Sequence, residues 1–446
     1  MSTPNPHDVL QGLIEAALRA GADAADALLV QSISASVSYR LGKLEDVERA
    51  ESSDLGLRVF VGQQVAFVSS TDLSSAGLAE LPGRAVSMAR LAPEDRFAGL
   101  APPDLLARDF ASLDLEDAQE PSAEALVERA RAVEGAAMAV PGIINSEGGS
   151  TSFNRNSVML ATSQGFIGGY AATSHNIGVA VLAGEGTAME RDYDYASARH
   201  DTDLEGPEIV GRRAGQRTVA RLNPRKVKSQ AVPVVYDPRV SSGLLSHFSG
   251  AISGAAVARG VTFLKDSMDR QVFSSSVNII DDPHRLRGLR SKPFDGEGVR
   301  NERKAIVESG VLNTWLLDCA SAKQLGLVTT GHAARGTSGP PSPSATNLYM
   351  EVGEKSREEL IEDIRDGLYV TELIGMGVNG VTGDYSRGAA GFWIENGQVA
   401  YPVSGVTIAG NLKDMFRKIT PASDLQFRYG FNAPTCRVEG MTIAGS

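Results

Sequence analysis

The sequence predicts an α+β protein in which an N-terminal, α/β sandwich-like region with an antiparallel sheet precedes a β-rich C-terminal domain. Apolar residues recur at helical spacing over 8–20, 74–91 and 122–140, and strand-like runs separate these segments. Beyond residue 232 the chain changes to short strands and glycine-rich turns, together with one helix of small residues at 239–259. Helices and strands are therefore partly segregated, which is typical of the α+β class.

The first predicted unit consists of a helix, an antiparallel sheet and a second helix. The helix at 8–20 ends at Gly21. We expect strands at 27–32, 36–41, 56–61 and 64–69. Residues 61–64 (VGQQ) are expected to form the turn between the last two strands. The helix at 74–91 completes the unit, and a proline-containing linker follows at 92–109.

The second predicted unit begins with the helix at 122–140. Strand candidates then lie at 142–147, 157–162, 166–173 and 177–183. A helix at 207–222 starts with a proline at a favourable first-turn position and is closed by Asn223 and Pro224. The predicted domains are therefore 1–93, 94–228 and 229–446.

Basic residues cluster on the 207–222 helix and just after it. They are Arg212, Arg213, Arg217, Arg221, Arg225, Lys226 and Lys228. Such a cluster is typical of a solvated helix face that leads into a linker, and the alternative interpretation is a contact to an acidic partner. The sequence leaves both interpretations open.

The helix predicted at 239–259 is unusually rich in small residues. Gly243, His247, Gly250 and Gly254 fall on one of its faces. Each interior glycine costs a helix about 1 kcal/mol relative to alanine, so a close approach to this face would explain them. That approach is either tight packing within the protein or a groove wall that takes an extended ligand.

Two turn motifs stand out in the C-terminal region. Strand-like runs at 389–394 and 398–402 flank residues 395–397 (ENG), which predicts a hairpin. Residues 375–380 (GMGVNG) match the dinucleotide-binding pattern G-x-G-x-x-G. No amphipathic helix follows them to bind a pyrophosphate, so these glycines are expected to serve turns.

Composition and charge exclude several classes of function. The chain has 43 basic and 54 acidic residues, a net charge of −11, which argues against a nucleic-acid ligand or an anionic membrane surface. Its two cysteines cannot form a disulfide framework and suit a reducing compartment. No signal peptide is visible at the N-terminus, and no apolar run approaches the length of a membrane span. We therefore expect a cytoplasmic protein.

Motifs of the common hydrolytic and metal sites are missing. The closest pair among the six histidines, His175 and His200, lies 25 residues apart, so H-E-x-x-H does not occur. There is no P-loop and no G-x-S-x-G nucleophile elbow. Cys319 and Cys436 are isolated from each other and from the histidines, which makes a structural zinc site unexpected.

Six segments nevertheless resemble one family, the TldD/PmbA proteins, and within it the PmbA (TldE) branch. They are 243–251 (GLLSHFSGA), 346–351 (TNLYME), 375–380 (GMGVNG), 391–397 (GFWIENG), 401–411 (YPVSGVTIAGN) and 438–445 (VEGMTIAG). The resemblance extends over the whole length of the chain. It implies the TldD/PmbA fold.

The resemblance also implies where a metal would be expected and why this chain departs from that pattern. In the TldD branch the small-residue helix carries a His-Glu-x-x-x-His zinc motif, whose three positions fall here on Ser246, His247 and Ala251. Shifting the alignment by one residue gives His247, Phe248 and Ile252. Either way at most one ligand survives, and a hydroxyl, an imidazole and a methyl group cannot bind zinc and supply a carboxylate base.

The family's third ligand, a cysteine, is not matched either, because Cys436 lies inside the last strand-like run at 434–438. By resemblance, the chain is therefore a non-metal subunit that pairs with a zinc-bearing TldD-like subunit. Such complexes cut unfolded or leader peptides and some antitoxins. An older family label is modulator of DNA gyrase. We expect no catalytic, cofactor or metal residue in this chain, and a homodimer when it is alone.

Two alternatives stay open. The chain could be a homodimeric peptide-binding or scaffold protein without catalysis. It could also be a metal-independent hydrolase that uses Ser246 and His247, although neighbouring helix residues point about 100° apart and make a poor nucleophile–base pair. In the preferred reading, the candidates for contact with an extended peptide are Gly243, His247, Gly250 and Gly254.

Overall fold

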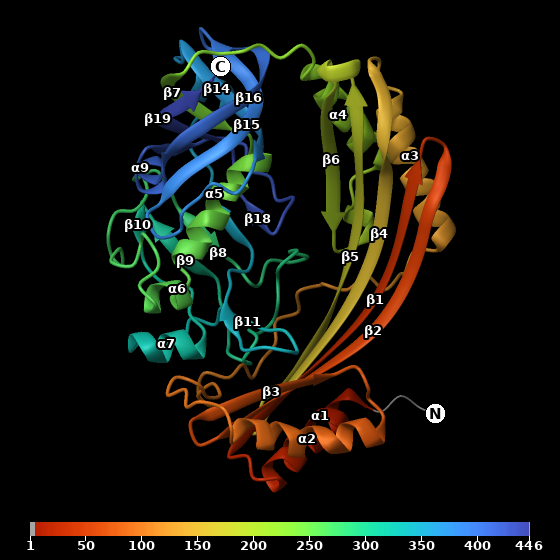
Figure 1. The fold of residues 1–446 in the computed structure, drawn as a ribbon, viewed down its shortest axis with the longest axis vertical. Coiled ribbons are helices and arrows are strands. Elements are labelled where there is room, and N and C mark those ends of the chain that lie inside the picture. Colours follow the sequence, from red (N-terminus) through yellow and green to blue (C-terminus); the bar gives the residue numbers. More distant parts are fainter. Residues whose placement is uncertain (1–4, 446) are drawn as a thin grey trace.

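The computed structural model describes residues 5–445 and confirms the α+β prediction. The first four residues, which belong to the N-terminal stretch judged to lack a signal peptide, lie outside this range. Within residues 5–445 none of the helices has both the length and the apolar character to cross a membrane. Two large sheets dominate the molecule and stand on opposite sides of it (Figure 1).

The N-terminal sheet is antiparallel throughout, in the order β3-β2-β1-β4-β5-β6. Its strands are β1 (Ala24–Arg40), β2 (Lys43–Val61), β3 (Gln64–Ser70), β4 (Ile143–Thr162), β5 (Ile167–Ala183) and β6 (Glu190–Ala198). Because β1 pairs with both β2 and β4, the segments 1–93 and 94–228 contribute to one continuous sheet. The predicted division into two units therefore separates their helices but not their strands.

Seven predicted short strands are wrong in extent. The runs 27–32 and 36–41 are one strand, β1, and the runs 142–147 and 157–162 are one strand, β4. The runs 166–173 and 177–183 are likewise one strand, β5, and the run 56–61 is the end of the longer β2. Polar residues in the middle of each, such as Ser34 in β1, pair across the sheet without interruption. An antiparallel sheet with one wet face accommodates polar side chains, so they do not end its strands.

Two helix pairs cover the two ends of this long sheet (Figure 1). They are α1 (Pro6–Arg19) with α2 (Ser75–Ala89), and α3 (Ala123–Met138) with α4 (Pro207–Ala220). Side-chain oxygens of Asn5, Ser74 and Ser122 cap the first three helices by accepting from backbone amides. In α4, Gly211 allows close packing on α3, because a Cβ there would lie 2.2 Å from the carbonyl oxygen of Val133.

The C-terminal domain contains a second six-stranded sheet in the order β16-β15-β14-β7-β19-β17. These strands are β7 (Gln230–Tyr236), β14 (Asp366–Ile374), β15 (Asp384–Glu395), β16 (Gln398–Asn411), β17 (Ile419–Pro421) and β19 (Cys436–Ala444). An additional pairing of β16 with β19 closes this sheet on itself. The β15–β16 hairpin is confirmed, and its turn residues Asn396 and Gly397 have φ values of 50° and 78°, as a type I′ turn requires.

A five-stranded sheet of short strands and five helices complete the domain. The sheet has the order β10-β9-β8-β13-β18. Its strands are β8 (Ile279–Asp281), β9 (Lys304–Glu308), β10 (Val311–Leu312), β13 (Leu348–Met350) and β18 (Phe431–Asn432). The helices are α5 (Pro238–Ala251), α6 (Gly254–Ala258), α7 (Cys319–Leu325), α8 (Arg357–Ile361) and α9 (Leu412–Arg417). A further small pair joins β11 (Ala333–Ala334) to β12 (Ser342–Pro343).

The single helix predicted at 239–259 is wrong, because the chain breaks between α5 and α6. The amide of Gly254 donates to the carbonyl of Leu316 at 2.8 Å, and the amide of Leu316 donates to the carbonyl of Ile252 at 3.1 Å. These bonds to a distant segment replace helical ones and hold residues 252–253 out of the helix. The sequence around the break contains no signal for them.

A buried ionic network ties the C-terminal domain to the N-terminal sheet. Asp26 in β1 is 1% exposed and accepts from Arg58 in β2, with Nε to Oδ2 at 2.9 Å. Its other oxygen lies 2.7 Å from Nη1 of Arg335, whose side chain is 1% exposed and belongs to the C-terminal domain. Burial alone would raise the pKa of Asp26, but the two guanidinium groups hold it below its ordinary value.

Removing one partner of this network should loosen the attachment of the two halves. Arg335→Met leaves the carboxylate of Asp26 with Arg58 alone, and we expect a loss of about 3 kcal/mol in the free energy of unfolding. Urea unfolding measures it as a lower midpoint. Arg84→Met, a change of the same type at an exposed position on α2, serves as the control. Equal stability of the two variants would contradict this role for Arg335.

Next to this network lies a carboxyl group with a raised pKa. Burial, with the neighbouring Asp295, raises the pKa of Glu297 to about 7. Glu297 accepts from the amide of Cys319 at 2.8 Å and lies 3.9 Å from the Arg58 guanidinium. Because the pKa of Glu297 is higher in the folded than in the unfolded chain, folding becomes less favourable as pH rises from about 4.5 to about 7.

Glu297→Gln should remove this part of the pH dependence. Between pH values of about 4.5 and 7 the unfolded chain loses the proton and the folded chain keeps it, so wild-type stability falls with pH. The neutral amide can still accept from Cys319, and the variant should gain up to about 3 kcal/mol on wild type by pH 7. Denaturation midpoints over this pH range test it. A constant difference across the range would show that Glu297 does not titrate there.

Candidate functional site

Helix α5 begins at a well-defined cap and buries one face. Asp237 accepts from the amide of Arg239 at 3.0 Å and from the hydroxyl of Tyr369 at 2.7 Å, which attaches the start of the helix to β14. Pro238 occupies the first helical position, where its missing amide proton costs nothing. The buried side is mainly apolar, with Leu244, Leu245, Phe248 and Ala251, and its one polar member, Ser241, donates to the carbonyl of Pro434 at 2.8 Å. The opposite face of α5 is therefore fixed in position by the core.

That opposite face is open. Ser246 and Gly250 are exposed, and Gly243 and His247 are half-buried. A Cβ built at Gly243 or at Gly250 would meet no atom within 4 Å, so space is free beside the helix backbone. Three of the four candidate groove residues thus share one unobstructed surface, which we call the open α5 face (Gly243, Ser246, His247 and Gly250).

The fourth candidate, Gly254, lies elsewhere. It is buried at the start of α6, where a Cβ would stand 2.5 Å from Cδ2 of Leu317 and 2.6 Å from Oγ of Ser321. Its small size therefore serves packing against α7 rather than the open α5 face. The sequence analysis placed it on that face only because it assumed an unbroken helix. The assignment of the other three to a substrate groove stays a prediction.

No acidic partner faces His247 among the residues that the structure describes. Its ring stands edge-on to Tyr385 in β15, with 6.1 Å between ring centroids. Burial lowers the pKa of His247, and the charge of Arg387 lowers it further, so the imidazole is neutral near pH 7. Tyr385 is 2% exposed, and its hydroxyl has no hydrogen-bond partner within residues 5–445. His247 therefore offers a neutral polar contact on this face, and it does not form an acid–base pair with Tyr385.

The residues at the implied metal position do not fit zinc. Ser246 and Ala251 present a hydroxyl and a methyl group on either side of His247, and Cys436 is fully buried in β19 with its thiol 3.8 Å from Sδ of Met350. Burial raises the pKa of the Cys436 thiol, which disfavours the thiolate that a metal requires. Within residues 5–445 no group of three His, Cys, Asp or Glu side chains is arranged to hold a metal ion.

A serine–histidine pair is not assembled either. The Ser246 hydroxyl donates back to the carbonyl of Ser242 at 3.4 Å, along its own helix. The structure does join a hydroxyl, an imidazole and a carboxylate elsewhere: Oγ1 of Thr330 lies 2.8 Å from Nδ1 of His332, whose Nε2 is 3.2 Å from Asp281. His332 is only 2% exposed, so this chain of bonds is structural. Thr330 and His332 are close in sequence, but Asp281 lies 51 residues before His332, so the sequence alone does not reveal the set.

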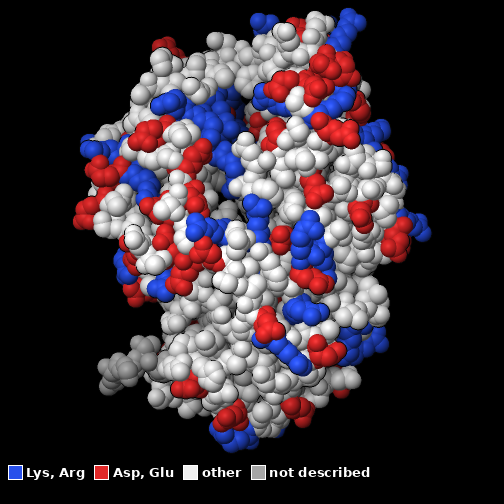
Figure 2. Space-filling model, turned by 180° about the vertical axis from the view of Figure 1, so that it is seen from behind, with Lys and Arg blue, Asp and Glu red and all other residues white. Residues whose placement is uncertain are grey.

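The basic helix α4 makes ion pairs within the protein. Arg217 lies 2.8 Å from Asp194 in β6, and Arg221 lies 2.6 Å from Glu372 in β14. From the C-terminal domain, Arg428 reaches Glu205 at 3.1 Å. Of the cluster that the sequence left open, Arg217 therefore pairs within the N-terminal half, whereas Arg221 pairs with a residue of the C-terminal domain. Figure 2 shows Lys and Arg side chains gathered around the hollow between these halves.

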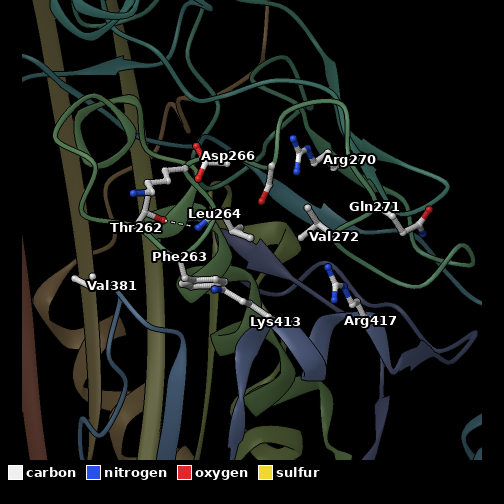
Figure 3. Close-up of a pocket in the computed structure, with 12 residues that line it drawn as sticks. Thr262, Phe263, Leu264, Asp266, Arg270, Gln271, Val272, Val381, Lys413 and Arg417 are labelled. Carbon is white, nitrogen blue, oxygen red and sulfur yellow. Dashed lines mark hydrogen bonds between the residues drawn. The ribbon is translucent and has the colours of Figure 1, made fainter.

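A second hollow lies beyond the C-terminal end of α5 (Figure 3). It has a volume of about 330 Å³ and lies between the segment 262–272 and α9, with Phe263 on its wall. Thr262 attaches this segment to α5 by donating to the carbonyl of Ala251 at 2.6 Å. Lys413 and Arg417 line the side formed by α9. The rest of the lining is mixed and includes the hydroxyl of Ser267 and the carboxylate of Asp266.

Comparisons with known proteins find relatives that match most of this chain. Three family models cover the chain: PmbA/TldA metallopeptidase domain 1 at 25–89, the central domain at 116–222 and the C-terminal domain at 229–445. The Metalloprotease PmbA of Escherichia coli O157:H7 is 41% identical over 95% of this chain and 92% of that protein. A PmbA homologue of Haemophilus influenzae is 37% identical over 97% of this chain and 94% of that protein.

Solved structures give the same result for the fold. A candidate modulator of DNA gyrase from Bacteroides thetaiotaomicron is 28% identical, with a TM-score of 0.91 and full coverage of both chains. TldE from Thermococcus kodakarensis is 21% identical, with a TM-score of 0.88 over 98% of this chain and 99% of that one. Together with the three family models, these structures define the fold as that of the PmbA/TldA metallopeptidase class. The chain belongs to the PmbA/TldD family, in its PmbA (TldE) branch.

The two neighbouring glycines provide a test of the open α5 face. Gly250→Ala should raise the free energy of unfolding by up to about 1 kcal/mol, because the helix gains propensity and nothing obstructs the methyl group. Gly254→Ala should lower it by about 1–3 kcal/mol, because α7 must move. Thermal and urea unfolding measure both. The same sign for both substitutions would show that the two glycines have similar surroundings.

Proposed function

We propose that this chain is the non-metal subunit of a cytoplasmic, TldD–TldE-type metallopeptidase complex that cleaves unfolded or leader peptides. One observation carries the proposal. The chain is 41% identical to a protein named a metalloprotease, yet the open α5 face presents Ser246 and His247 without a second metal ligand or a carboxylate base. Catalysis would then come from a zinc-bearing TldD-like partner. A TldD homologue of Buchnera aphidicola is 23% identical over 58% of this chain.

The role of this subunit would be to hold the peptide in an extended form. The free space beside Gly243 and Gly250 suits a peptide backbone that passes close to the helix. The edge of the N-terminal sheet suits it less. In β6 the carbonyls of Tyr193 and Tyr195 already accept from Arg239 at 3.2 Å and from Arg428 at 3.1 Å. Strand addition, which needs free edge groups, would therefore displace arginines there.

Reconstitution tests the division of labour. The chain and a TldD-like subunit from the same genome are purified separately, dialysed, analysed for zinc and then mixed with an unstructured leader-type peptide. We expect zinc only in the partner and cleavage only in the mixture. Cleavage by this chain alone that is abolished by His247→Ala would support the independent hydrolase. Peptide binding without any effect on the partner's activity would support the homodimeric scaffold.

Gly250→Leu tests the surface that the proposal assigns to the peptide. A leucine would fill the free space on the open α5 face and, like alanine, would favour the helix. We therefore expect at least a tenfold loss of cleavage in the mixture with a melting temperature no lower than that of wild type. Gly250→Ala, which adds only a methyl group, is the matched control and should retain most activity. Full activity of the leucine variant would place the peptide elsewhere.

A further inference from the structure

A cavity different from the hollow of Figure 3 lies between the two halves of the molecule, away from the open α5 face. It has a volume of about 360 Å³ and is walled on one side by β4 and β5 and on the other by segments 289–292 and 344–346. Three of its lining residues are cationic: Arg199, Arg290 and Lys292. None of its lining residues is Asp or Glu. This is unexpected in a chain with a net charge of −11.

The three cations use neutral oxygens as their partners. Arg199 donates to the carbonyls of Gly288, Thr173 and Leu289 at 3.2, 2.9 and 2.5 Å. Arg290 donates to the hydroxyl of Ser344 at 3.0 Å and to the carbonyl of Ala345 at 2.9 Å. Lys292 donates to the carbonyl of Ala333 at 2.8 Å. These bonds position the side chains, and within residues 5–445 none of the three makes a salt bridge with a carboxylate.

Two carboxylates that do not line the cavity act on Lys292, and both accept hydrogen bonds from other groups. Asp281 accepts from the amide and the hydroxyl of Thr346 at 2.7 and 2.5 Å. Asp295 accepts from the amides of Glu297, Val299 and Ala333 at 2.9 to 3.0 Å. Burial lowers the pKa of Lys292 although both carboxylates act to raise it. An anion in the cavity would stabilise the charged form of this lysine.

The shape and the apolar part of the cavity favour a carboxylate on a carbon stem. Val158, Tyr170 and Ala172 form an apolar wall, and the volume exceeds what an inorganic ion alone would fill. Guanidinium groups match the two oxygens of a carboxylate. We propose that this cavity binds an acidic side chain of the peptide, which rests on the proposed role of the chain in holding peptides. We call it the cation cavity (Arg199, Arg290 and Lys292).

The test compares two fluorescent peptides that differ in one residue, acetyl-Ala-Ala-Glu-Ala-Ala and its Gln counterpart, each with an amidated C-terminus and the dye on an added lysine. Fluorescence anisotropy with the full chain should give at least tenfold tighter binding of the Glu peptide, and added salt should weaken only that peptide. Inorganic phosphate at equal ionic strength is the third arm. Phosphate that competes as well as the unlabelled Glu peptide would overturn the choice of a carboxylate.

Substitutions locate the binding. Arg290→Gln and Lys292→Met should each weaken the Glu peptide about tenfold and leave the Gln peptide unchanged. Lys292→Arg, which retains the charge, should retain the preference. Arg84→Gln on α2 removes an exposed charge far from the cavity and should have no effect. If Lys292→Met does not fold, as circular dichroism would show, the more exposed Arg290 variant decides the outcome.

The outcomes separate this inference from the proposed function. Equal binding of the two peptides by wild type would overturn the acidic preference and leave peptide holding intact. A Glu preference that persists in both charge-removing variants would overturn the location. Binding of neither peptide would overturn the inference, and cleavage in the reconstituted complex would then report on the proposed function independently.

Discussion

The carboxylate of Asp26 is the point on which the arrangement of the two halves depends. It lies on β1, the central strand of the N-terminal sheet, and is shared by Arg58 of the neighbouring strand and Arg335 of the C-terminal domain. Taking three charges out of water is costly unless all of them are paired, so the C-terminal loop that carries Arg335 cannot move without exposing an unpaired charge. At the other end of the sheet, Arg221 and Arg428 make comparable ties. Ion pairs therefore join the two halves at both ends of the long sheet.

The fold class, most helices and the β15–β16 hairpin could be predicted because their signals are local. Helical periodicity, capping side chains and an Asn-Gly turn act within a few residues. The strands were harder, because polar residues such as Ser34 looked like strand ends although their backbone groups pair across 14 consecutive positions of β1 and β4. The break between α5 and α6 could not be predicted at all. It depends on hydrogen bonds to Leu316, more than sixty residues further along the chain.

The candidate site was predicted in part for the same reason. Gly243, His247 and Gly250 lie within one helix, so their common face follows from helical geometry. Gly254 was misplaced because the helix was assumed to continue. The chain of bonds through Thr330, His332 and Asp281 and the cation cavity are formed by segments brought together only by the fold. The ion pairs of Arg217 and Arg221 could not be predicted from the basic cluster, because their partners Asp194 and Glu372 lie far away in the sequence.

In the proposed function, the open α5 face and the cation cavity would supply different parts of what a peptide needs. The α5 face offers room beside the backbone but no charge, because the only ionisable group there is a neutral imidazole. The cation cavity offers charge but little free backbone, because Arg199 already occupies the carbonyls around it. The edge of β6 is likewise occupied by Arg239 and Arg428. A bound segment would therefore be selected by its own acidic side chain and by its ability to stay extended. It would not be selected by an apolar pocket of the kind that reads one particular sequence.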